Sequence, residues 1–396
     1  MTNVASARPF DRPGSPGLSA YPHALSPQLR TPGPTPLPER VLRAAVRPMI
    51  SHRSPEFTAL LGECVEGIRW AIQTTGDILL FPSSGTGGLE AAVANLLSPG
   101  EPALFAAMGW YGEMWADMAE AFGARPVRLR APWGEAIDAC SLDAALAQDH
   151  QLRKVFLTHN ETSTAISNDM CALSKVVKDH GCLLVVDSVS GAGCLPFPVD
   201  ELGADVVVTA SQKGWLAPPG LTMIALSRDA LAAAGAARCP RWYFDFLVQK
   251  QFQDKGATSM TPPISVMYAL REGLAMMQEE GRERVWRRHR EVASIVRSGL
   301  VRAGLDLYGT ATGRSDTVTA VKSPFETPDD LAEFLSELRE RYALVLAEGH
   351  GPLHGRIFRV GHLGSIEPTD AHQVVDRIGH ALAARTRGSR LKRRAM

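Results

Sequence analysis

The sequence predicts an α/β protein built on a mostly parallel sheet, and two observations support this fold class. Short apolar runs alternate with helix-length amphipathic segments between residues 77 and 234, which is the pattern of repeated strand–helix units. The runs are continuous rather than alternating, as in Leu183–Val186 and Val206–Ala210. Continuous β-branched and aliphatic runs are typical of parallel strands that are buried on both faces of a sheet.

Length and composition set the domain organisation. The chain has 396 residues, which favours two domains, because domains usually hold roughly 100 to 200 residues. We expect a loosely ordered, Pro-, Ser- and Gly-rich arm over residues 1–30, a large domain over 31–265, a small α+β domain over 266–384 and a solvated basic tail over 385–396.

The predicted elements follow in chain order. Two helices, over 38–46 and 57–74, precede the large domain's strands over 78–81, 103–107, 126–129, 154–158, 183–186, 206–210 and 221–226. Helices are expected between them over 89–97, 113–122, 141–147, 172–180 and 228–234. In the small domain we expect helices over 266–278, 284–303, 329–339 and 371–383, with strands over 317–321 and 357–360.

The overall charge excludes some classes of partner. Lys and Arg together number 42, as do Asp and Glu, so the net charge is zero. This balance gives no reason to expect nucleic acid or an anionic membrane as a partner. No apolar run approaches the roughly 18 residues of a membrane span. The six cysteines lack metal-ligand spacing, and the N-terminus lacks a signal-peptide pattern, so we expect free thiols, no metal and a cytoplasmic protein.

Chemically active side chains follow two of the predicted strands. Asp187 ends the run 183–186, and Lys213 follows the run 206–210. Ligands collect at the carboxyl ends of parallel strands, so an acid and an amine there indicate a site. Upstream, Ser84-Gly85-Thr86 stands between a strand and a helix, where backbone N–H groups favour a phosphate. This loop matches no nucleotide-binding fingerprint, and an ordinary tight turn explains it equally well.

Taken together, these pieces meet the requirements of a pyridoxal phosphate site. A lysine forms a Schiff base with the cofactor's aldehyde, and a carboxylate keeps the pyridine nitrogen protonated so that the ring accepts electrons. Lys213 and Asp187 suit these two roles. Each residue by itself also fits a simpler role, Asp187 as a turn residue and Lys213 as an exposed loop lysine.

Five ordered motifs resemble those of a known family. They are S-S-G-T-G-G-L-E-A, T-H-N-E-T-S-T, V-V-D-S-V-S-G-A-G, S-Q-K-G-W-L-A-P-P-G and F-R-V-G-H-L-G. The chain resembles the class V aminotransferases of the fold-type I pyridoxal phosphate enzymes, in particular the alanine–glyoxylate and serine–glyoxylate branch, from about residue 32 to 383. The resemblance implies a large domain with a mostly parallel seven-stranded sheet and a smaller C-terminal domain.

The resemblance also implies roles for individual residues at the cofactor. Lys213 would be the Schiff-base lysine and Asp187 the partner of the pyridine nitrogen. The remaining cofactor-binding positions are Ser84, Gly85, Thr86 and Gln212 at the phosphate, Tyr111 stacking on the ring in preference to Trp110, and Thr162 bonding the ring oxygen. His159 is expected to be a packing residue.

Other matched positions concern the substrate and a second subunit. Arg359 would clamp the substrate carboxylate in a bidentate manner, with Gly33 as a further substrate-binding position and Arg356 as an ordinary strand-edge residue. Thr261 matches a residue that reaches the cofactor phosphate of the partner subunit, so a homodimer with shared sites is implied. Thr258 departs from the family pattern, because some relatives carry a tyrosine there.

The implied function is transamination by a ping-pong mechanism, from a small serine- or alanine-like amino acid to a glyoxylate- or pyruvate-like 2-oxo acid. Three alternatives remain. One is a pyridoxamine or aminophosphonate aminotransferase in a specialised biosynthetic pathway. Another is a lyase such as a cysteine desulfurase, although Gln212 stands where those enzymes carry histidine and Cys239 has no evident activating partner. The third is a non-catalytic α/β binding protein.

Overall fold

The large domain is a seven-stranded sheet in the computed structural model, which describes residues 28–394. Its strands, in spatial order, are β2 (Asp77–Ser83), β10 (Gly220–Leu226), β9 (Val206–Ala210), β8 (Leu183–Asp187), β5 (Lys154–Thr158), β3 (Pro102–Ala107) and β4 (Arg125–Arg130). Only the β10 pairings are antiparallel within this sheet. The predicted α/β class with a mostly parallel sheet is confirmed.

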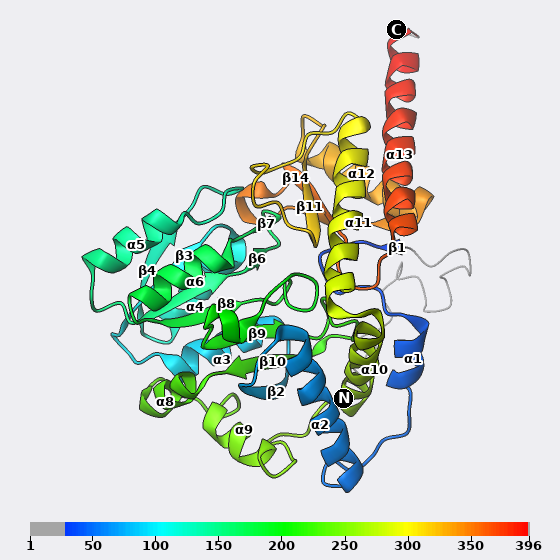
Figure 1. Cartoon of the computed structure of the whole chain (residues 1–396). Coiled ribbons are helices and arrows are strands. Elements are labelled where there is room, and N and C mark those ends of the chain that lie inside the picture. The colour runs from blue at the N-terminus through cyan, green and yellow to red at the C-terminus, as the bar shows by residue number, and fades with distance from the viewer. Residues whose placement is uncertain (1–27, 395–396) are drawn as a thin grey trace, which may run out of the picture.

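Helices cover both faces of this sheet (Figure 1). One face packs on α3 (Gly85–Leu96), α4 (Trp110–Ala121), α8 (Arg228–Ala236) and α9 (Phe246–Gln253). The other packs on α2 (Pro55–Ile72), α5 (Ala139–Gln148), α6 (Met170–Asp179) and α10 (Ile264–Glu280). In β8, Leu184 and Val186 join the second core whereas Val185 joins the first. The continuous apolar run therefore fills two cores, because successive side chains point to opposite faces.

Helix α9 is an element that the sequence analysis missed. Its glutamines bond to the main chain of edge strand β2. Gln249 Nε2 donates to Leu80 O at 2.9 Å and Gln253 Nε2 to Ile78 O at 2.7 Å, while Gln253 Oε1 accepts from Leu80 N–H. These side-chain amides thus form hydrogen bonds with main-chain groups of β2 that have no neighbouring strand to pair with. The sequence of α9 has no strong apolar stripe, because polar side chains make much of its contact with β2.

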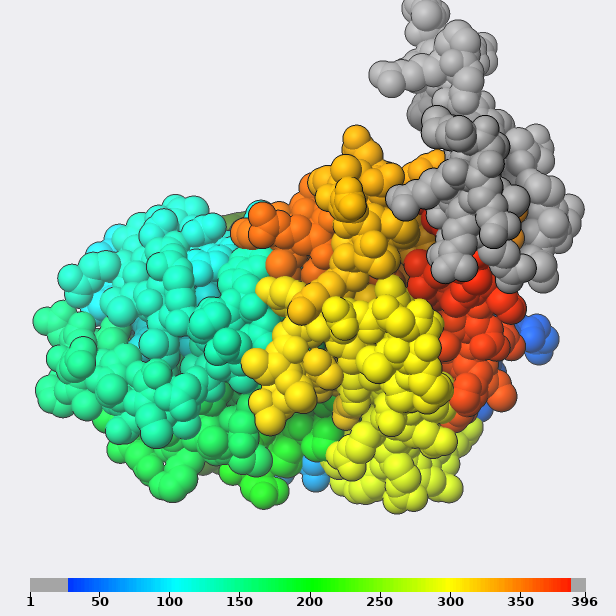
Figure 2. Space-filling view, turned by 90° about the horizontal axis from the view of Figure 1, so that it is seen from above, coloured from blue at the N-terminus to red at the C-terminus, as the bar shows by residue number. Residues whose placement is uncertain are grey.

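The small domain packs beside the large one. Its antiparallel sheet has the order β11 (Val318–Lys322), β14 (Ile357–Gly361) and β13 (Ala347–Glu348), with η1 (Gly351–Leu353) in the loop between β13 and β14. It is covered by α11 (Arg282–Arg302), α12 (Pro328–Tyr342) and α13 (Pro368–Arg394). Figure 2 shows these yellow to red elements on one side of the molecule and the cyan and green large domain on the other.

Both predicted terminal segments differ from expectation within the described residues. Residues 1–27 of the expected arm lie outside the described part, but β1 (Gln28–Leu29) pairs in parallel with β12 (Leu344–Val345) of the small domain. Helix α13 continues to Arg394, so residues 385–394 of the expected tail prolong this helix.

The remaining elements are short. They are α1 (Glu39–Ala45), α7 (Val199–Leu202) and the hairpin of β6 (Asn160–Glu161) and β7 (Ile166–Ser167). Within residues 28–394, no helix combines the length and the apolar character that crossing a bilayer requires.

Candidate active site

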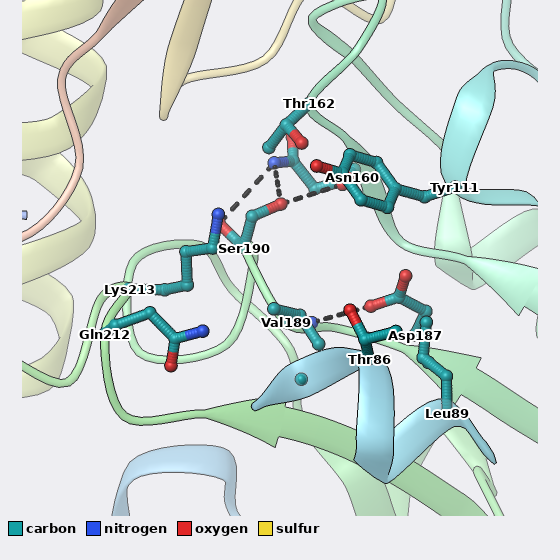
Figure 3. A pocket seen from close by; sticks show the side chains of 11 residues that line it. Thr86, Leu89, Tyr111, Asn160, Thr162, Asp187, Val189, Ser190, Gln212 and Lys213 are labelled. Carbon is teal, nitrogen blue, oxygen red and sulfur yellow. Dashed lines mark hydrogen bonds between the residues drawn. The ribbon is translucent and has the colours of Figure 1, made fainter. Parts of the chain in front are cut away.

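The predicted acid and amine line one cavity at the carboxyl ends of β8 and β9. It encloses about 120 Å³ and is bordered by Gly85, Thr86, Leu89, Tyr111, Asn160, Thr162, Asp187, Val189, Ser190, Gln212 and Lys213. Figure 3 shows the side chains of Asp187 and Lys213 entering the cavity from different sides. The structure therefore brings together residues that lie far apart in the sequence.

Asp187 is the last residue of β8 and is only 6% exposed. The pleat of the strand turns it to the same face as Val185, toward α3 and α4. Its carboxylate accepts a hydrogen bond from Val189 N–H at 2.9 Å. Burial raises the pKa of Asp187 to about 7, an effect that the Val189 bond and the charge of Lys213 oppose. A carboxylate so placed readily holds a proton or pairs with a cationic ring nitrogen.

Lys213 lies in the loop after β9, and its ammonium donates to the carbonyl of Pro32. Burial lowers the pKa of this lysine to about 8, while Asp187 opposes the shift and Arg359 adds to it. A lysine with a lowered pKa is a better nucleophile and proton carrier near neutral pH.

Gly33 makes room for this amine. A Cβ at Gly33 would lie 2.5 Å from Lys213 Cδ and 2.7 Å from Nζ, and its φ of +114° suits glycine alone. The predicted substrate position thus contacts the amine directly.

The start of helix α3 forms the floor of the cavity. Ser84 is the N-cap residue, its side chain makes no capping hydrogen bond, and the first turn contains no acidic residue. Ser84 and Thr86 are exposed, and Gly85 packs so closely on Val189 that a Cβ would lie 2.9 Å from the valine methyls. Uncapped N–H groups at the positive end of a helix suit a phosphate.

Gln212 provides an independent sign that a polar ligand fits here. Its buried Oε1 has no hydrogen-bond partner among the described residues, although its side chain borders the cavity. A buried polar atom without a partner is unfavourable, so a ligand in the cavity that donates to Gln212 would relieve that cost.

Tyr111 and Val189 form facing walls of the cavity (Figure 3). Tyr111 is the second residue of α4, whereas its neighbour Trp110 is 42% exposed. A planar ring between an aromatic face and an aliphatic side chain is a favourable arrangement. The placement agrees with the choice of Tyr111 over Trp110 as the stacking residue.

Glu161 holds Tyr111 in place, a role that the sequence analysis missed. This fully buried carboxylate accepts from the N–H groups of Tyr111 at 3.0 Å and Gly112 at 3.2 Å. Its other oxygen accepts from the N–H and hydroxyl of Ser163. Burial raises the pKa of Glu161, and these hydrogen bonds oppose that rise. The carboxylate thus caps the start of α4.

Arg359 reaches the site from the small domain. In β14, Phe358 and Val360 point into the small-domain core, so the pleat directs Arg359 the opposite way. It is 3% exposed, and Nη1 donates to Thr162 O at 3.0 Å. Burial lowers its pKa. Arg356 is exposed, as expected for the residue kept outside the site.

Four predicted site residues do not line the cavity itself: Gly33, Ser84, Thr261 and Arg359. Thr261 is exposed and does not line it, which fits a role toward another subunit. His159 is buried, bonds Ser188 Oγ at 2.9 Å and stacks on Phe197 with ring centroids 4.6 Å apart. Burial lowers the pKa of His159 to about 4, so it is neutral and has the packing role that was expected of it.

Further cavity residues were not predicted. Asn160 Nδ2 donates to Ser190 Oγ at 2.7 Å and to Thr317 Oγ1 at 2.9 Å, which links two strand ends of the large domain to the small domain. Asn160 and Ser190, the two of these residues that border the cavity, stand in polar runs at strand ends, T-H-N-E-T-S-T and D-S-V-S. That position at the strand ends was the signal that could have identified them.

Comparisons with known proteins agree with this geometry. The family model described as aminotransferase class-V matches residues 31–357. An L-aspartate–glyoxylate aminotransferase of Paracoccus denitrificans is 38% identical over 86% of this chain and 86% of its own length. A serine–glyoxylate aminotransferase of Methylorubrum extorquens is 37% identical over 85% of this chain and 86% of its own.

A solved structure is similar as well. Pyridoxamine–pyruvate aminotransferase from Mesorhizobium loti superposes with a TM-score of 0.86 at 29% identity, covering 92% of this chain and 94% of its own. The matched family region includes the floor of the cavity and Lys213, and it ends at Ile357, the first residue of β14 and two residues before Arg359. From its sequence, fold and similarity to these enzymes, the chain belongs to the class V aminotransferases, a family of pyridoxal phosphate-dependent enzymes.

Proposed function

We propose that this aminotransferase binds pyridoxal phosphate in the cavity and moves an amino group from a small amino acid to a small 2-oxo acid such as glyoxylate. One observation carries the proposal: the amine of Lys213, the buried acid Asp187 and the free start of α3 border a single cavity. The aspartate– and serine–glyoxylate specificities of the two relatives support this substrate class.

The residues present fit the cofactor. Its phosphate would lie at the uncapped start of α3, beside Ser84 and Thr86, where N–H groups and hydroxyls are free to donate. Tyr111 and Val189 would hold its ring from either side, and Asp187 would pair with its pyridine nitrogen. When bound, the cofactor supplies an aldehyde for amines and a ring that accepts electrons.

Lys213 then carries out the proton transfers. With a pKa lowered to about 8, its amine holds or releases a proton near neutral pH, as a general acid–base group requires. Arg359 fixes the substrate's carboxylate, and this places the Cα proton toward Lys213. Because the amino donor and the oxo acceptor would use the same cavity, and the first 2-oxo acid would leave before the second enters, we expect ping-pong kinetics.

The similarity to pyridoxamine–pyruvate aminotransferase raises a second candidate, in which free pyridoxamine is the donor. The start of α3 favours the first candidate, because its uncapped N–H groups and lack of acidic residues suit an anionic phosphate. A desulfurase needs a reactive thiol, yet none of the six cysteines borders the cavity among residues 28–394. Burial also raises the pKa of Cys239.

We propose further that the enzyme is a homodimer in the cytoplasm. Trp242 is 88% exposed, and Tyr243 and Phe252 are also exposed; such aromatic surface favours a protein interface. Exposed Ser84, Thr86 and Thr261 would meet across that interface. The free cysteines agree with a reducing compartment.

A half-reaction experiment tests the proposed reaction. The purified, cofactor-loaded protein is mixed once with serine, alanine, aspartate, cysteine or pyridoxamine, and released 2-oxo acids, sulfide or pyridoxal are quantified. Stoichiometric 2-oxo acid from a small amino acid, reversed by glyoxylate, is expected. Release of pyridoxal from pyridoxamine alone, or of sulfide from cysteine, would overturn the proposal.

Subunit mixing tests the shared site. Thr261→Ala and Lys213→Ala chains are each expected to have low activity, whereas co-expressed mixed dimers regain it, because one site then has both Lys213 and the partner's Thr261. No regained activity in confirmed mixed dimers would show that Thr261 does not act across the interface.

A further inference from the structure

His350 contacts Arg359 at the rim of the candidate site, and no part of the proposed mechanism uses it. It lies between β13 and η1, with its ring 6.4 Å from that of Trp110 and 6.0 Å from that of Tyr111. Its Nε2 is 3.0 Å from Arg359 Nη2. A guanidinium has only donors, so His350 Nε2 accepts this hydrogen bond and carries no proton.

The loop is shaped to hold the ring there. A Cβ at Gly349 would lie 2.1 Å from Leu353 O, and a Cβ at Gly351 would lie 2.7 Å from the Trp110 ring. Gly351 also has a φ of +51°, in the left-handed region. The glycines on either side of His350 therefore allow a close fold that larger residues would open.

The hydrogen bonds of Arg359 leave little capacity for a substrate. Nε and Nη2 donate to Glu348 O at 2.9 and 2.6 Å, and Nη1 donates to Thr162 O at 3.0 Å. With the bond to His350, four of the five N–H groups of a guanidinium are used. A carboxylate that binds in a bidentate manner needs two.

One acceptor must therefore give way, and His350 is the one that can. The other two acceptors are backbone carbonyls fixed by the sheet edge and by the Thr162 segment, whereas an imidazole turns by side-chain rotation. Burial and the nearby charges of Arg359 and Lys213 lower the pKa of His350 to about 4, so the ring remains an acceptor at neutral pH. Tyr111, the other titratable group facing it, is uncharged there because burial raises its pKa.

We propose that His350 sets the carboxylate affinity of the site: it takes the place of a substrate carboxylate oxygen on Arg359 and is displaced when the carboxylate binds. The inference rests on the proposed role of Arg359. Because any carboxylate must displace the imidazole, His350 lowers affinity for all carboxylates by a similar factor and so sets how tightly they bind, not which of them binds. It also keeps the guanidinium satisfied while the site is empty.

The test measures glycolate binding to the cofactor-loaded protein by calorimetry at pH 7.5. Removing the competing acceptor in His350→Leu should tighten glycolate binding about 3- to 10-fold, as expected for one hydrogen bond to a charged group that no longer has to break. His350→Gln retains an acceptor and should bind like wild type. His354→Leu, an exposed histidine of the same loop, is the matched control and should also be unchanged.

Two outcomes overturn the proposal. Equal or weaker glycolate binding by a folded His350→Leu protein shows that the imidazole does not compete with the carboxylate. If His350→Leu does not fold, His350→Ala removes the same acceptor, and equal or weaker glycolate binding by that variant has the same meaning. Arg359→Ala separates this result from the proposed function: if it binds glycolate like wild type, the carboxylate site itself lies elsewhere.

Discussion

The floor and the rim of the candidate active site are built in different ways. The floor comes from strand ends and one helix start of the large domain: Asp187 is the last residue of β8, Ser84 directly follows β2, and Lys213 lies in the loop after β9. The rim comes from the small domain, where Arg359 and His350 meet through a loop and a strand. The floor is thus fixed by local chain geometry, whereas the rim depends on how the two domains pack. In the proposed function, the proton chemistry depends on the floor and carboxylate binding on the rim.

The largest expected effect lies on the floor. Lys213→Ala should lower turnover at least about 10³-fold, because the general acid–base group is lost, while the folded structure is retained. Lys175→Ala, an exposed lysine on α6, should leave turnover unchanged. Steady-state rates with serine and glyoxylate measure both. Substantial turnover by Lys213→Ala would place the proton transfer on another group.

A rim variant should affect binding more than chemistry. Arg359→Lys keeps the charge but loses the planar fork, so kcat/KM should fall roughly 10- to 100-fold, mainly through KM. Arg356→Lys, on the exposed neighbour, is the control and should behave like wild type. If kcat fell instead and KM stayed constant, the separation between floor and rim would fail.

The floor also lowers stability in the absence of cofactor. Burial raises the pKa of Asp187 to about 7, above its unfolded value of about 4, so the folded protein holds a proton that the unfolded chain has released. The free energy of unfolding should therefore fall as pH rises from about 4 to 7. Asp187→Asn should remove this loss and stabilise the cofactor-free protein at pH 8 by about 4 kcal/mol, from a pKa difference of about three units at about 1.4 kcal/mol per unit, while turnover falls.

Urea unfolding at pH 5 and pH 8 measures this effect. Asp200→Asn is a control with the opposite sign, because hydrogen bonds from Thr74 and Thr75 lower the pKa of Asp200, and that contribution is lost only as pH falls. A less stable Asp187→Asn protein at pH 8 would show that the buried carboxylate is stabilising.

The smallest effect is expected at Glu161, whose carboxylate accepts hydrogen bonds from the start of α4 and so holds Tyr111 at the cavity wall. Glu161→Gln turns an amide N–H₂ toward one pair of N–H or O–H donors, so one donor pair loses its acceptor, at a cost of about 1 to 3 kcal/mol. We expect a lower melting temperature and cofactor affinity reduced several-fold. Glu120, on α4, the helix that Glu161 caps, has an exposed carboxylate, and Glu120→Gln should change neither. Unchanged cofactor affinity in Glu161→Gln would mean that Tyr111 needs no such support.

The floor of the site could be predicted from the sequence more fully than the rim. The strands, the fold class and the places of Asp187 and Lys213 follow from apolar runs that end in polar residues. Gln249 and Gln253 of α9 gave no signal, because their bonds to β2 exist only after folding. The contact between His350 and Arg359 likewise depends on a tight glycine loop, whose path is set by packing against Trp110.

Reduction of the cofactor-loaded protein with borohydride, followed by peptide mass spectrometry, tests the central claim most directly. Reduction makes the bond between the cofactor and its lysine permanent. The account predicts one phosphopyridoxyl group per chain, on the peptide that contains Lys213, and none on that peptide in Lys213→Ala. Attachment to another lysine, or no attachment in protein with bound cofactor, would contradict the assignment of this cavity as the active site.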